Sequence, residues 1–211
     1  MTEYWREVDH ERATLADQLT ELSEAEWNRR SLCDKWLVRD VAAHLSILKL
    51  MSVGRSVTEA VRARGNFDRM IVNVTAEVAE RHTNAELVTE LRSMIGSRRR
   101  APGTKPTEPL LDILVHGQDI MVPLGRERPI PTAAGLVALE RVWTIGFPFH
   151  AKKKLRGLRL KTTDADWSGG DGELVEGPLR AILLLAAGRV DGALPDLSGD
   201  GVQALKARMT S

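Results

Sequence analysis

Apolar residues recur every three or four positions through most of the first 146 residues, and after that the pattern changes. This spacing puts apolar side chains on one face of a helix, and it predicts helices over residues 3–22, 36–60, 68–81, 84–99, 108–121 and 132–146. Residues 159–163 alternate as a strand does, residues 164–177 suit a strand and a turn, and residues 178–187 form a strongly apolar helix. We therefore expect a helical part, 1–146, and a smaller α/β part, 147–211.

Composition excludes several classes of protein. Of the 211 residues, 43% are hydrophobic and 28% are charged, which is typical of a soluble globular chain. The formal net charge is +1, so no global attraction to nucleic acid or to an anionic membrane is expected. The single Cys excludes a disulfide framework, the charged start lacks the apolar core of a secretory signal, and the longest apolar run is too short to span a membrane. We expect a cytoplasmic protein.

Three residues in two predicted helices are candidates for a metal site. Asp112 and His116 are four positions apart, which brings their side chains to the same helix face, where an imidazole and a carboxylate can bind one cation. His44 lies among apolar residues of another predicted helix and can supply a third ligand. Three protein ligands leave a position open for water or substrate, as in catalytic sites. Nitrogen and oxygen donors favour Zn²⁺, although Fe, Ni or Mn would also fit.

The spacing alone leaves two alternatives open. Asp40 and His44 form a second pair four positions apart, so the sequence pattern does not say which carboxylate would be a ligand. A core histidine that hydrogen bonds to a neighbouring carboxylate would also explain either pair without a metal.

Three segments, taken in order, resemble one known family. They are WLVRDVAAHL at residues 36–45 with Cys33 before it, DILVHGQDIMVPLG at 112–125 and, more loosely, GPLRAILLLAAGR at 177–189. Together they resemble the mycothiol-dependent maleylpyruvate isomerase family, which belongs to the DinB-like metal-binding four-helix bundles. The resemblance implies a mainly α fold, with a DinB-like bundle at 1–146 that carries the metal site and a small α/β domain at 147–211.

The same resemblance implies a divalent metal, with Zn favoured, held by His44, Asp112 and His116. The best-known family members carry Glu where this chain has Asp112, and the shorter side chain must sit closer to the metal or reach it through water. Asp40 and Asp119 also match motif positions. Each would either support a ligating histidine or serve as a helix cap or salt-bridge partner.

The function implied by the resemblance uses mycothiol, a low-molecular-weight thiol, as cofactor. A metal-bound thiol is deprotonated, and the thiolate adds to the activated double bond of an electrophilic or enedioate substrate. Rotation and elimination then give an isomerase, whereas retention of the carbon–sulfur bond gives an S-transferase. The alternatives are a non-catalytic metal- or ligand-binding module and a metal-assisted hydrolase. We expect a monomer or a weak homodimer, with neither nucleic acid nor membrane as a partner.

Overall fold

The computed structural model describes residues 2–34, 36–50, 67–100 and 104–209, and the chain divides into two compact units. Unit 1 is Met1–Arg126 and unit 2 is Glu127–Ser211. The fold is mainly helical with a small sheet near the C-terminus, which confirms the predicted fold class. The predicted helix over 36–60 begins at Val38, and its part beyond Leu50 lies outside the described residues. None of the described helices is long and apolar enough to span a membrane.

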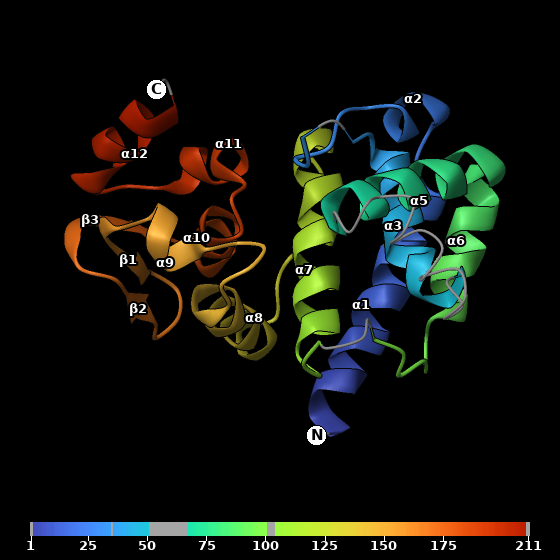
Figure 1. The fold of residues 1–211 in the computed structure, drawn as a ribbon, viewed down its shortest axis with the longest axis horizontal. Coiled ribbons are helices and arrows are strands. Elements are labelled where there is room, and N and C mark those ends of the chain that lie inside the picture. The colour runs from blue at the N-terminus through green and yellow to red at the C-terminus, as the bar shows by residue number, and fades with distance from the viewer. Residues whose placement is uncertain (1, 35, 51–66, 101–103, 210–211) are drawn as a thin grey trace. The chain divides into compact units, whose positions relative to one another are not determined.

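Unit 1 is a bundle in which four helices contact one another in a ring. Helix α1 contacts α6 and α7, and α3 also contacts α6 and α7, while the fifth long helix, α5, packs on α3 (Figure 1). The elements of this unit are α1 (Thr2–Thr20), α2 (Glu24–Trp27), α3 (Val38–Leu50), α5 (Phe67–Arg81), α6 (Asn84–Ser93), α7 (Glu108–Met121) and the 3-10 turn η1 (Val122–Leu124).

Local sequence signals explain where several of these helices begin. Thr83 caps α6: its side chain accepts from Glu86 N–H while the Glu86 carboxylate accepts from Thr83 N–H, which is a capping box. Pro109 lies in the first turn of α7, where its missing N–H costs nothing. Almost every later residue of α7 is buried, because neighbours cover it on several sides. The polar residues His116, Gln118 and Asp119 of α7 are therefore held in a protein interior, whereas Asp112 is partly exposed.

Unit 2 joins helices to a three-stranded sheet. Its elements are α8 (Thr132–Thr144), α9 (Ala151–Lys154), β1 (Gly157–Thr162), β2 (Ser168–Gly169), β3 (Gly172–Gly177), α10 (Leu179–Ala186), α11 (Val190–Ala193), η2 (Leu194–Asp196) and α12 (Gly201–Met209). Strand β1 lies in the middle, antiparallel to β2 and parallel to β3, with Leu160 opposite Val175. Both of these side chains are fully buried, so the alternation in the sequence matches a sheet with one covered face.

The division between the units lies earlier than the sequence predicts. We expected the helical part to end at 146, but the division falls after Arg126, and α8 belongs to unit 2. The reason is packing: α8 contacts α10 and α9, and a Cβ at Gly135 in α8 would lie only 2.7 Å from Leu179 Cδ2. The absent side chain lets the two helices approach closely. Periodicity shows that α8 has an apolar face but not which element covers it.

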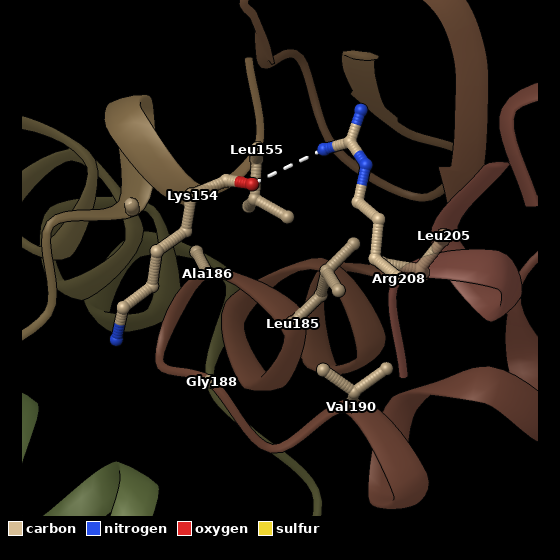
Figure 2. Close-up of a pocket in the computed structure, with 9 residues that line it drawn as sticks. Lys154, Leu155, Leu185, Ala186, Gly188, Val190, Leu205 and Arg208 are labelled. Atoms are coloured by element: carbon tan, nitrogen blue, oxygen red, sulfur yellow. Dashed lines mark hydrogen bonds between the residues drawn. The ribbon is translucent and has the colours of Figure 1, made fainter. Parts of the chain in front are cut away.

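Unit 2 also contains a small pocket of about 150 Å³. Its lining is mainly apolar and includes Leu155, Leu185 and Val190, and Arg208 on one side donates to the carbonyl oxygen of Lys154 at 3.1 Å (Figure 2). Arg208 is thus tied to the backbone, as its second nitrogen also donates to the carbonyl of Arg156. None of the candidate metal ligands lies in this pocket.

Candidate metal centre

The structure brings His44, Asp112 and His116 together inside unit 1. Asp112 and His116 face the same side of α7, one turn apart, and His44 comes from α3, which packs against α7. Asp112 Oδ1 lies 3.4 Å from His116 Nε2 and 3.7 Å from His44 Nε2. One donor atom from each residue lies within 4.8 Å of the other two. The two imidazole rings are 4.8 Å apart between centroids.

These separations suit donors that share one ion better than donors that bond to each other. Two ligands at about 2.0–2.1 Å from a tetrahedral Zn²⁺ lie about 3.3–3.4 Å apart. The 3.4 Å between His116 Nε2 and Asp112 Oδ1 matches this spacing. The 3.7 Å between His44 Nε2 and Asp112 Oδ1 is too long for a good hydrogen bond. Two nitrogens and one carboxylate oxygen also form the donor set of many catalytic zinc sites. The residues therefore fit a divalent ion.

Asp112 and His116 stabilise each other's charged forms. Burial alone would lower the pKa of His116, but the carboxylates of Asp112 and Asp119, one beside each ring nitrogen, raise the pKa well above the usual 6.5. Burial alone would raise the pKa of Asp112, but the neighbouring imidazoles of His116 and His44 hold it well below 3.8. Because 40% of the Asp112 side chain is exposed, water moderates this second effect. The carboxylate is therefore ionised and available as a ligand at neutral pH.

The two further acidic residues of the motifs have different roles. Asp40 accepts from the N–H of Leu37 at 2.8 Å, so it caps the start of α3. Asp119 is fully buried on α7, and its Oδ2 lies 2.8 Å from His116 Nδ1. The sequence allowed each of these residues either to support a histidine or to serve as a helix cap or salt-bridge partner. In the structure Asp40 is a helix cap, and Asp119 supports His116.

Two residues beside the site, Trp36 and Cys33, belong to the first family-like segment but were not predicted from the sequence as site residues. The half-buried Trp36 ring lies 5.1 Å from the His44 ring and 6.4 Å from the His116 ring. The Cys33 thiol donates to Asp119 Oδ2 at 3.0 Å. Both belong to the segment before α3, which folds onto α7 through a hydrogen bond from Leu32 N–H to the carbonyl of Asp119. Only their position just before the histidine motif marks them in the sequence.

Residues 8–111 match the family described as "Mycothiol maleylpyruvate isomerase N-terminal domain". That match includes His44 and ends just before Asp112. No curated protein matches the chain.

Solved structures provide a second comparison. The chain is similar to the crystal structure of the mycothiol-dependent maleylpyruvate isomerase, with 15% identity over 94% of this chain and 92% of that one and a TM-score of 0.50. A point mutant described in the same words aligns with 16% identity over the same shares of both chains and a TM-score of 0.48. At this identity the first likeness establishes a common fold across both units, and only the fold.

Proposed function

Residues 8–111 belong to the mycothiol maleylpyruvate isomerase N-terminal domain family, and on this premise we propose that the chain is a metal- and mycothiol-dependent isomerase or S-transferase. One observation carries the proposal. Two imidazole nitrogens and a carboxylate oxygen, from two helices far apart in the sequence, lie within 4.8 Å of one another. A group of this composition suits a divalent ion with a position left for a further ligand.

In the proposed site each residue has a distinct part. His44, Asp112 and His116 would hold the ion, with Zn²⁺ as the ion that this donor set favours. The side chain of Asp112 is short, but its Oδ1 already approaches both imidazoles, so no longer side chain is required. When bound, the ion supplies the positive charge that keeps a thiol in its reactive thiolate form.

Trp36 would contribute a wall to the site. Its indole lies beside both imidazoles, and it is half-buried, so it shields one side of the donor group from water. Exclusion of water favours addition of a thiol over hydrolysis. The open side of the group lies near Asp112, the most exposed of the three side chains.

The substrate class follows from the reaction class. A thiol adds to a double bond that electron-withdrawing groups activate, so the substrate is an electrophile or an enedioate. Elimination of the thiol gives a geometric isomer, and retention of the carbon–sulfur bond gives a conjugate. We propose a cytoplasmic enzyme that acts on small molecules, as a monomer or weak homodimer.

The test is turnover by the zinc-loaded chain with and without mycothiol, using maleylpyruvate for isomerisation and a chromogenic aryl halide for conjugation. We expect turnover that requires the thiol and is lost in His44→Ala. His82→Ala is the matched control, because His82 lies in the connection between α5 and α6, outside the donor group, and its ring bonds to the carbonyl of Val78. Bound metal with no thiol consumption would favour a binding module, and turnover without any thiol would favour a hydrolase.

A further inference from the structure

Asp119 is a carboxylate in an interior position that has no contact with water. Its exposure is 0%, and an ionised group in such a place is unfavourable unless hydrogen bonds stabilise it. Two groups meet the same oxygen, Oδ2: His116 Nδ1 at 2.8 Å and the Cys33 thiol at 3.0 Å. The three side chains thus form a chain of contacts that leads from the segment before α3 into the candidate metal centre.

The thiol is itself held in place by the backbone around it. Cys33 N–H donates to the Ser31 hydroxyl at 3.1 Å, and the neighbouring Leu32 N–H donates to the Asp119 carbonyl at 3.0 Å. The segment is therefore fixed to α7 at the residue whose side chain it contacts. This attachment fixes the position of the thiol.

The contact with Asp119 determines which nitrogen of His116 is available to an ion. A carboxylate accepts hydrogen bonds, so the proton of the neutral imidazole resides on Nδ1. The lone pair is then on Nε2, the atom that faces Asp112 at 3.4 Å. His44 has no such support, because its buried Nδ1 has no hydrogen-bond partner among the described residues. One candidate ligand is held in a fixed tautomer, and the other is not.

We propose that Asp119 and Cys33 are positioning residues of the metal centre. Asp119 fixes the tautomer and the orientation of His116, and the Cys33 thiol holds the Asp119 oxygen in place. This proposal rests on the proposed function, because it assumes that His116 binds the ion. In this proposal, His116 is the ligand whose tautomer and orientation are fixed, and His44 is the ligand whose ring is free to adjust to the ion.

The same three side chains form a second group that is able to bind a metal ion, with Cys33, His116 Nδ1 and Asp119 as ligands. The distances favour the hydrogen-bonded arrangement. Around one tetrahedral zinc ion, nitrogen and oxygen ligands lie about 3.3 Å apart, and sulfur and oxygen ligands about 3.5 Å apart. The observed 2.8 Å and 3.0 Å are shorter and are ordinary hydrogen-bond lengths.

The experiment measures Co²⁺ and Zn²⁺ affinity by chelator competition in the wild type, Asp119→Asn, Cys33→Ala and Cys33→Ser. Loss of a residue that orients a ligand typically weakens metal binding by about 10–100-fold. We expect Asp119→Asn to fall in that range, since its amide can donate to Nδ1 and stabilise the other tautomer. Cys33→Ala should weaken binding by about tenfold or less, and Cys33→Ser, which keeps a donor to Asp119, should recover much of the loss.

Two further measurements separate this proposal from its alternatives. Long-range ¹H–¹⁵N correlation on ion-free protein, recorded at a pH above the raised pKa of His116, reports the tautomer of its neutral ring, and we expect the proton on Nδ1 in the wild type. The Co²⁺ spectrum should lack a sulfur-to-cobalt charge-transfer band, and its presence would make Cys33 a ligand and overturn the proposal. Urea unfolding of each variant identifies a merely structural effect, which would change stability and leave affinity and tautomer unchanged.

The experiments give different results if this inference fails and if the proposed function fails. Wild-type protein that binds no divalent ion would contradict the proposed function, and the tautomer measurement would still test the role of Asp119. Wild-type protein that binds the ion, with Asp119→Asn and Cys33→Ala binding it equally tightly, would overturn the positioning role alone.

Discussion

The interiors of the two units differ in what they bury. Among the described residues, the buried polar and charged side chains of unit 2 are Arg128 and Thr162, and its helix α10 is apolar almost throughout. The interior of unit 1 holds many more: Glu11, Arg12, Ser46, Thr75, His116, Gln118 and Asp119. The pocket of unit 2 has a mainly apolar lining, whereas the candidate centre of unit 1 brings together imidazoles and a carboxylate.

Buried polar groups stabilise a fold less effectively than apolar ones. The larger number of buried polar side chains in unit 1 therefore requires an explanation. In unit 1 part of the reason is structural: Arg12 donates to the carbonyls of Met94 and Ser97 and so ties α1 to the end of α6. His116 and Asp119 instead contact each other at 2.8 Å, beside the candidate metal ligands. Unit 1 thus buries polar groups both in links between helices and in the candidate metal centre, whereas the interior of unit 2 is mainly apolar.

The largest effect on stability is expected in the core of unit 2. Leu183 is fully buried on α10, and truncation of such a side chain costs about 2–5 kcal/mol of unfolding free energy. We expect Leu183→Ala to lower the urea midpoint by the corresponding amount and to leave metal affinity of the folded protein unchanged. A large loss of metal affinity in the folded variant would break the division of roles between the units.

A backbone position in the sheet should give the next largest effect. Gly172 begins β3 with a φ of +119°, and a Cβ there would lie 2.2 Å from the carbonyl oxygen of Gly157 on β1. Gly172→Ala should destabilise the protein by more than about 1 kcal/mol, since both the conformation and the space exclude a side chain. Thermal unfolding measures this loss of stability, and an unchanged midpoint temperature would contradict the close approach of β3 to β1.

In unit 1 a helix cap gives a smaller and more local effect. Thr83→Ala removes the side-chain cap of α6 and should cost about 1 kcal/mol. Thr89→Ala is the matched control, because the exposed Thr89 hydroxyl bonds only to the carbonyl of Ala85 within the same helix. Chemical denaturation of both variants compares them. Equal losses would mean that α6 is stabilised by its packed face and not by its cap.

The smallest expected effect is a pH dependence at the surface of unit 1. Hydrogen bonds from the Ser23 backbone and side chain, and then from Arg126, lower the pKa of Glu26 from 4.5 to about 2. A carboxylate with a lowered folded-state pKa stabilises the fold above its unfolded pKa, and this contribution disappears as the pH falls from about 4.5 to about 2.

Glu26→Gln tests this dependence. Its unfolding free energy should fall less steeply than that of the wild type over this acidic range, as measured by urea unfolding at a series of pH values. Parallel slopes for the two proteins would show that other carboxylates govern the acid sensitivity of unit 1.

Helix periodicity predicted most of the fold and part of the site. The spacing of Asp112 and His116 fixes their common face, because both belong to one helix. The meeting of His44 with that pair depends on how α3 packs on α7, which spacing within one helix does not encode. The sequence likewise left Asp40 and Asp119 equivalent, and only tertiary contacts distinguish the cap of α3 from the partner of His116.

The part played by Cys33 was beyond the sequence for a related reason. It lies in a segment without helical period, and its contact with Asp119 joins residues 86 positions apart. The sequence did not predict that α8 belongs to unit 2, because an apolar helix face does not indicate which element covers it. Each of these omissions concerns a contact between elements.

The most direct measurement is the amount of zinc retained per chain after dialysis, determined by mass spectrometry in the wild type, His44→Ala, Asp112→Ala and His82→Ala. The wild type and His82→Ala should each retain a single ion. His44→Ala and Asp112→Ala should lose it while their circular dichroism stays that of the folded protein. Wild-type protein without zinc, or folded variants that keep it, would contradict a centre built from these side chains.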